Sequence, residues 1–291
     1  SNHVTVHFYP HPSDLPPSNS TSQAMLEFRF QLIGLCFGFY ASVLLFFHLL
    51  SSTLSHVYNT LQAKQKFYWN HLATRSVFGI QSLVAGLTAL TWDSEFSRDI
   101  MRGQENWSWS MIFTTAGYFL FENVAFHTYN LVFRSFDLAL AIHHLYALSV
   151  FFCLAFISDS GGHYVPVVAL LLEMSTPFIC ISWMLQKVGW GKSQLWKANQ
   201  WVMIHTFHIR MVVTYYIWWV CLSHWAAVNN NYPLTLRLIF YIGLTLLTVI
   251  INPFWTYKKT MQLFNSLAWN FDHKMEPFQH ESGKIHIHIS L

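Results

Sequence analysis

The run LALAIHHLYALSVFFCLAFI, from Leu138 to Ile157, decides the class of fold. About 20 predominantly apolar residues cross the hydrocarbon core of a bilayer as one helix, and this run has that length and composition. It also holds two adjacent histidines, His143 and His144, at a depth where polar groups are costly to insert. The run therefore predicts a membrane helix whose two imidazoles need an explanation.

The composition of the whole chain agrees with a membrane protein. Of its 291 residues, 53% are apolar and 10% are charged, whereas soluble domains contain about 25% charged residues. The short connections RSFD and SDSGG leave no room for a soluble domain. The sequence predicts an all-α, multispanning membrane helix bundle with about seven transmembrane helices. We expect these spans at roughly 30–50, 72–92, 110–132, 138–157, 163–186, 200–223 and 236–256.

Two polar tails flank the predicted bundle. Residues 1–27 are rich in Pro, Ser, Asn and His and are expected to form a flexible tail, residues 28–257 the transmembrane domain, and residues 258–291 a second tail. Lys and Arg are concentrated in the 51–71 and 187–199 connections and in the C-terminal tail. Such an excess marks cytosolic segments, so we expect a cytosolic C-terminus and a lumenal N-terminus.

Polar side chains recur within four consecutive predicted spans. They are Glu122, Asn123 and His127 in the third span, His143 and His144 in the fourth, Glu173 in the fifth, and His205, His208 and Arg210 in the sixth. Asn123 and His127 are four residues apart, and His205 and His208 are three apart, so each pair shares one helix face. Because such groups are rare at bilayer depth unless they are used, we expect them to point into a shared polar cavity.

A structural alternative stays open for these residues. A single histidine on an apolar face, such as His127 or His208, is often a hydrogen-bonded helix contact. Arg210 could pair with Glu122 or Glu173 and hold the bundle together. The joint pattern, above all the adjacent His143 and His144, favours a functional site.

Metal chemistry is not expected at this site. Adjacent residues of a helix point about 100° apart, so His143 and His144 cannot easily share one ion. His205 and His208 could share one, but no carboxylate or thiol lies nearby in the sequence to complete a ligand set. We therefore expect no metal and no cofactor, and the net charge of +3 gives no sign of a nucleic-acid partner.

Acyl transfer suits the residues better. A neutral imidazole is both a nucleophile and a general base near physiological pH. A carboxylate such as Glu173 can fix the tautomer of a neighbouring histidine, as in hydrolases. Arg210 or a basic cytosolic rim could hold a phosphate group.

These residues also carry a resemblance to a known family. The motif IHHL, followed about thirty residues later by LLLEMSTPF, resembles the TLC-domain family, which includes the ceramide synthases. The longer motifs KFYWNHLATRSVFGIQS, GYFLFENVAFH, NQWVMIHTFHIRMVVTY and IINPFWTYKKT narrow the resemblance to an endoplasmic reticulum membrane protein of this family. The likeness covers roughly residues 30–270. It implies a tunnel formed by six helices, with one additional N-terminal helix.

The resemblance implies an activity as well. His143 would carry an acyl group received from cytosolic acyl-CoA, a co-substrate, with His144 as its partner. The acceptor would be a phospholipid precursor or glycerophosphodiester: glycerophosphoglycerol would become lysophosphatidylglycerol and support bis(monoacylglycero)phosphate synthesis for lysosomes. The resemblance leaves two alternatives. One is a cargo receptor that carries lysosomal enzymes from the endoplasmic reticulum towards the Golgi, for which the 93–109 loop could meet partners; the other is a lipid-sensing, ceramide-synthase-like protein in contact with membrane lipids.

Overall fold

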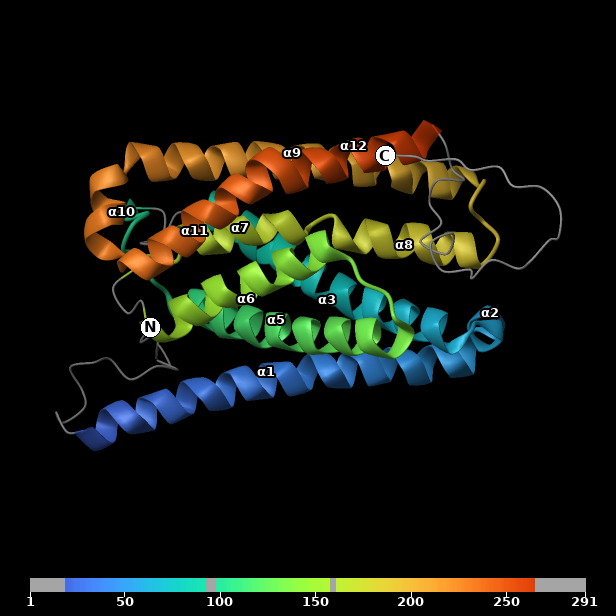
Figure 1. Cartoon of the computed structure of the whole chain (residues 1–291), viewed down its shortest axis with the longest axis horizontal. Coiled ribbons are helices and arrows are strands. Elements are labelled where there is room, and N and C mark those ends of the chain that lie inside the picture. The colour runs from blue at the N-terminus through green and yellow to red at the C-terminus, as the bar shows by residue number, and fades with distance from the viewer. Residues whose placement is uncertain (1–18, 93–97, 158–160, 265–291) are drawn as a thin grey trace, which may run out of the picture.

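The computed structural model describes residues 19–92, 98–157 and 161–264, and these form a bundle of long helices (Figure 1). The helices are α1 (Asn19–Leu54), α2 (His56–Thr60), α3 (Ala63–Thr91), α5 (Asn106–Phe133), α6 (Leu138–Ile157), α7 (Tyr164–Ala169), the 3₁₀ turn η2 (Leu170–Glu173), α8 (Thr176–Lys187), α9 (Gln194–Ser223), α10 (Trp225–Asn231), α11 (Leu234–Leu246), the π-helical segment η3 (Leu247–Ile251) and α12 (Asn252–Phe264). The predicted all-α membrane bundle is confirmed.

The number of spans is only partly supported. Among the described residues, four helical stretches are long and apolar enough to cross a membrane: Gln23–Leu54, Leu138–Phe156, Tyr164–Lys187 and Leu234–Met261. The pair α9 and α10, bent by 81°, gives a fifth candidate. The helices α3 and α5 lie at expected spans but do not reach this hydropathy, because they carry many of the polar residues described below. The count of seven spans stays a prediction.

The ends of the bundle differ from the expected tails. Helix α1 begins at Asn19, inside the segment expected to be flexible, and α12 continues past residue 257 to Phe264. Residues 1–18 and 265–291, which make up most of both expected tails, lie outside the described residues. The domain boundaries and the sidedness of the termini therefore stay predictions.

The packing order places α1 at one edge of the bundle and α9 with α12 at the opposite edge (Figure 1). Helix α1 packs along α5 and α3, α6 packs on α5, and α8 packs on α3. The outer face of α1 exposes large apolar side chains such as Leu35, Phe39, Leu45 and Leu49. This face is suited to lipid contact, while the polar residues are gathered inside.

Two prolines interrupt helices close to the buried polar residues described below. Pro177 lacks a backbone N–H, and its ring would clash with the carbonyl of Glu173 four residues earlier, so the helix changes to the 3₁₀ turn η2 there. Gly79 on α3 allows this break to come close, because a Cβ at Gly79 would lie 2.9 Å from Pro177 Cδ. Pro253 is the second residue of α12, which begins directly after the π-helical η3.

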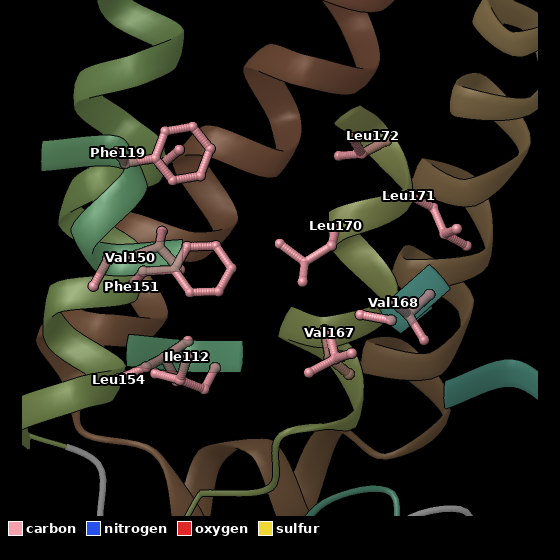
Figure 2. Close-up of a cluster of buried hydrophobic side chains, with 14 of the residues drawn as sticks. Ile112, Phe119, Val150, Phe151, Leu154, Val167, Val168, Leu170, Leu171 and Leu172 are labelled. Atoms are coloured by element: carbon pink, nitrogen blue, oxygen red, sulfur yellow. The ribbon is translucent and has the colours of Figure 1, made fainter. Parts of the chain in front are cut away.

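The core lies between α5, α6 and the broken segment α7–η2. Figure 2 shows side chains of α5 and α6, among them Phe119 and Phe151, on one side and those of α7–η2, such as Val167 and Leu170, on the other. These residues are buried and belong to one apolar cluster. The cluster holds α6 and η2 at a fixed separation, and these two segments carry His143 and Glu173.

Candidate active site

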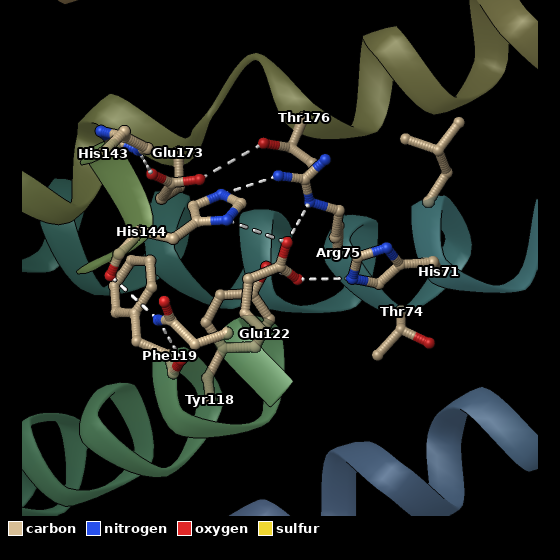
Figure 3. Close-up of polar contacts among 12 residues, drawn as sticks. His71, Thr74, Arg75, Tyr118, Phe119, Glu122, His143, His144, Glu173 and Thr176 are labelled. Carbon is tan, nitrogen blue, oxygen red and sulfur yellow. Dashed lines mark hydrogen bonds and ion pairs between the residues drawn. The ribbon is translucent and has the colours of Figure 1, made fainter. Parts of the chain in front are cut away.

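The deepest charged group of the bundle is Glu122 on α5, which is completely buried. Its Oε2 lies 2.8 Å from Nε2 of His71 and accepts a hydrogen bond from the Tyr118 hydroxyl at 3.3 Å. Its Oε1 forms an ion pair with Nε of Arg75 at 3.1 Å (Figure 3). Burying a carboxylate is tolerated only with such compensation, so these partners fix α3 against α5.

His144 completes this cluster, which we call the Glu122 network (His71, Arg75, Tyr118, Glu122 and His144). Nη2 of Arg75 lies 2.7 Å from Nε2 of His144, and Nδ1 of His144 is 3.3 Å from Glu122 Oε1, a contact rather than a hydrogen bond. A guanidinium group can only donate, so Nε2 of His144 must accept and the proton of the neutral ring must sit on Nδ1. Both ring nitrogens of His144 therefore face network members.

His143 has a different environment. Its Nε2 lies 3.2 Å from Glu173 Oε1, and Thr176 donates to the other carboxylate oxygen at 3.5 Å (Figure 3). Because the carboxylate accepts from Nε2–H, the lone pair is left on Nδ1. Nδ1 is buried and has no hydrogen-bond partner among the described residues. The ring centroids of Trp255 and His143 are 5.5 Å apart, and the two rings are arranged edge to face.

An apolar cavity begins at this pair. It is lined by His143 and Glu173 and otherwise almost entirely by apolar side chains of α5, α6, α7, η2, α9, α11 and η3, and it is open on one side rather than enclosed. A second apolar pocket adjoins it and shares Val150, Pro166 and Phe240. Between His143 and Leu154 of the second cavity, α6 rises about 16 Å, close to the thickness of one leaflet. The apolar lining of the two adjoining pockets suits contact with a fatty chain.

The structure brings together some of the predicted site residues. Glu122, Asn123, His143, His144 and Arg210 are buried, and Glu173 is partly buried. Asn123 donates to the backbone carbonyls of Phe119 and His144, at 2.7 and 3.1 Å, and so ties α5 to α6 beside the histidine pair.

Arg210 lies near the site but outside the Glu122 network. Its Nη1 donates to Ser175 at 2.9 Å, and its guanidinium group lies over the rings of Phe207 and Trp255. The ion pair of Glu122 is with Arg75 instead.

Three predicted positions are wrong. His127, His205 and His208 are exposed on the outside of the bundle, so they do not point into the cavity. His208 bonds only within its own helix, to the carbonyl of Ile204 at 2.9 Å. His205 and His208 do share a face, with ring centroids 6.1 Å apart, but α9 packs through its opposite face.

The sequence reasoning missed His71, Arg75, Tyr118 and Trp255 as members of the site. The spacing of His71 and Arg75 was an available signal, because residues four apart on a helix face one partner. Within the described residues, no three His, Cys, Asp or Glu side chains are placed to hold a metal ion. The expectation that no metal or cofactor takes part stays a prediction.

Comparison of the sequence with known proteins shows which family the chain belongs to. The family model for the TLC domain, of the TRAM, LAG1 and CLN8 group, matches residues 27–260. The chain is 53% identical over 236 residues to Protein CLN8 of Homo sapiens, which covers 81% of this chain and 82% of that protein. Protein CLN8 of Mus musculus is 53% identical over 235 residues, 81% of each chain. TLC domain-containing protein 2 of Danio rerio is 22% identical over 185 residues, 62% of this chain and 71% of that protein.

No solved structure matches the chain. The sequence matches nevertheless show that the chain belongs to the TLC-domain family of membrane proteins. Within that family it falls among the CLN8 proteins, named for neuronal ceroid lipofuscinosis, and this confirms the resemblance carried by the motifs.

Proposed function

We propose that the protein is an acyl-CoA-dependent acyltransferase of the endoplasmic reticulum membrane in which His143 carries the acyl group. One observation carries the proposal: Nδ1 of His143 is buried without a partner among the described residues, in a ring that lines an apolar cavity. The opposite nitrogen is held by Glu173. A nucleophile oriented by a carboxylate beside a space for an apolar chain is the arrangement that acyl transfer needs.

The first step forms an acyl-imidazole. The Nδ1 lone pair attacks the thioester carbonyl of acyl-CoA, the C–N bond forms, and the C–S bond breaks. The proton on Nε2 passes to Glu173, 3.2 Å away, and on to the departing thiolate, which leaves as CoA. The thioester is already activated, so the step needs no metal or redox group.

The second step returns the histidine to its starting state. A hydroxyl of the acceptor attacks the acyl carbonyl, and the C–N bond breaks. The proton of that hydroxyl passes through Glu173 back to Nε2. His144 is a positioning residue in this scheme, because its Nε2 accepts from Arg75 and its Nδ1 faces the Glu122 carboxylate rather than the apolar cavity.

The finer identity of the reaction is also a proposal. We propose that acyl-CoA arrives from the cytosol and that the acceptor is a glycerophospho-compound, glycerophosphoglycerol, whose acylation yields lysophosphatidylglycerol for bis(monoacylglycero)phosphate supply and lysosome function. Membership of the TLC-domain family and the apolar cavity support a lipid substrate. The cargo-receptor alternative depends on the 93–109 loop, and residues 93–97 of it lie outside the described residues.

Reconstitution of the purified protein tests the proposal. With labelled acyl-CoA and glycerophosphoglycerol, the protein should form labelled lysophospholipid, and His143→Ala should abolish this while remaining folded. His205→Ala, on the exposed face of α9, is the matched control and should keep full activity. Unchanged turnover in His143→Ala would rule out the mechanism.

A further inference from the structure

A second group of buried polar side chains lies on α9 and α12, and the steps above do not use it. Its members, which we call the α9–α12 polar group, are Arg210, Asn252, Thr256 and Lys259. Asn252 is completely buried, and the other three are at most 8% exposed. The two helices pack directly against each other.

Three members of this group, Arg210, Asn252 and Thr256, have side-chain atoms without a hydrogen-bond partner among the described residues. The unpartnered atoms are Nε and Nη2 of Arg210, Nδ2 and Oδ1 of Asn252, and Oγ1 of Thr256, all buried and none bonded within the described part of the chain. More than nine in ten buried polar groups in proteins are normally satisfied by protein or water. Five unsatisfied atoms on two adjoining helices therefore indicate that something polar belongs between them.

The local sequence explains why these atoms gather there. Pro253 has no backbone N–H and cannot take part in the regular helical hydrogen bonds. The π-helical η3, which ends just before α12, adds a residue to the turn and so changes which side chains of α12 point inward. Single π turns of this kind are frequent at functional sites. Positions 252, 256 and 259 are then four and three residues apart and share one helix face.

Arg210 lies one aromatic ring from the proposed nucleophile. The guanidinium carbon of Arg210 is 5.4 Å from the ring centroid of Trp255, and that ring is 5.5 Å from the ring of His143. Among the described residues no carboxylate lies within ion-pair distance of Arg210, although Glu173 is near enough to attract its charge; the hydrogen bond of Arg210 is to Ser175. The group therefore offers positive charge and free donors, with hydroxyl and amide oxygens able to accept.

We propose that the α9–α12 polar group is the subsite for the phosphate and polyol of the acceptor, a glycerophosphodiester whose phosphate is bound by Arg210 and whose hydroxyls are met by Asn252 and Thr256. A guanidinium group has the planar donor geometry that phosphate oxygens accept. The proposal rests on the proposed acyl transfer at His143 and assigns the residues that bind the acceptor there.

Acyl-CoA also carries phosphates, but its chemistry does not fit this position. Its phosphates are separated from the thioester by the long pantetheine arm, so they cannot lie beside His143 while the thioester reacts there. In a glycerophosphodiester the phosphate is only a few bonds from each reacting hydroxyl. Because Arg210 is separated from His143 only by the ring of Trp255, its position suits the phosphate of the acceptor better than the phosphates of acyl-CoA.

Steady-state kinetics with Arg210→Met test this subsite. The KM for glycerophosphoglycerol should rise at least about 30-fold, because the phosphate loses its buried charged partner. The KM for acyl-CoA, and the burst of CoA released when no acceptor is present, should stay at the level of the unmodified protein. Asn252→Leu and Thr256→Val should raise the same acceptor KM by smaller factors, and Arg210→Lys should restore part of the loss. His208→Gln, on the exposed face of α9, should change neither KM.

Binding without turnover separates this inference from the proposed function. In the unmodified protein, glycerophosphoglycerol should raise the unfolding temperature, whereas diglycerol, the uncharged analogue without phosphate, should not. His143→Ala should keep this shift even though it cannot turn over. If glycerophosphoglycerol stabilises the protein but neither the unmodified protein nor any variant turns it over, the acyltransferase proposal fails and the proposed binding subsite stands. Equal effects of the phosphodiester and diglycerol, or an Arg210→Met variant that raises both KM values alike, would overturn the subsite.

Discussion

His143 and His144 are neighbours in the chain, but their surroundings differ as much as those of a core residue and an active-site residue. His144 is enclosed by the Glu122 network, where Arg75 and Glu122 face both of its nitrogens. His143 has Glu173 at one nitrogen and an open, apolar cavity beside its ring, with Nδ1 unpartnered in the described structure. In the proposed mechanism, the same side chain on the same helix is structural at one position and reactive at the next.

The contrast arises from the helix geometry. Successive residues on α6 point about 100° apart, so one imidazole of an adjacent pair faces α3 and α5 while the other faces η2 and α12. In the proposed mechanism, the contacts of His144 with Arg75 and Glu122 hold this part of α6 in place and thereby position His143.

Glu122→Gln should have the largest effect, because it breaks the structural side of the pair. Removing this charge leaves Arg75 buried without its carboxylate, and breaking a buried pair in this way costs about 3–5 kcal/mol. Thermal or chemical unfolding in detergent, with His205→Gln as the exposed control, measures the loss. Stability equal to that of the control would show that the network does not hold the bundle.

Substituting each histidine in turn should separate the two roles. His143→Asn should lower turnover by about 10³-fold or more, and its cost in stability should not exceed about 1–3 kcal/mol, that of one lost hydrogen bond to Glu173. His144→Asn should instead destabilise the fold by about 1–3 kcal/mol, because Nη2 of Arg75 loses its buried acceptor, and should keep measurable turnover. Unfolding curves and initial rates on the same preparations check both. The reverse pattern would exchange the two roles.

Filling the cavity should sharpen the assignment of the reactive side. Ala147 lines the cavity, and Ala147→Phe should shorten it, which should shift the preference towards shorter acyl-CoA by roughly tenfold. Leu145→Phe, two residues away on the exposed face of α6, is the control and should keep the original preference. A competition assay with acyl-CoA of mixed lengths measures the shift, and an unaltered profile would place the chain elsewhere.

The smallest effect is expected from the double variant His205→Gln with His208→Gln. Both side chains are exposed and neither lies at the cavity, so stability should change by less than about 0.5 kcal/mol and turnover should not change. A marked loss of turnover would show that His205 or His208 contributes to the site after all.

The sequence predicted the class of fold and the histidine pair but not the full site. Apolar runs of membrane length located the helices, and the charge deficit indicated the membrane environment. The shared face of His205 and His208 was correct, but its direction was not. A helix surrounded by lipid is apolar on every side, so its spacing shows which residues share a face but not which face points inward.

The same limit explains the missing members of the Glu122 network. His71 and Arg75 lie near the start of an expected span, where a charge is usually attributed to the membrane edge. Their role follows from the packing of α3 against α5, a contact between segments about fifty residues apart in the chain. The place of Trp255 beside His143 depends on the helix distortion at Pro253, whose effect on helix direction no spacing rule gives.

The central claim is that His143, not His144, becomes acylated, and burst kinetics test it most directly. Mixing the protein with acyl-CoA in the absence of acceptor should release CoA in a burst stoichiometric with the protein. The account predicts that His144→Asn keeps this burst and His143→Asn loses it. A burst that survives in His143→Asn and disappears in a folded His144→Asn would contradict the account.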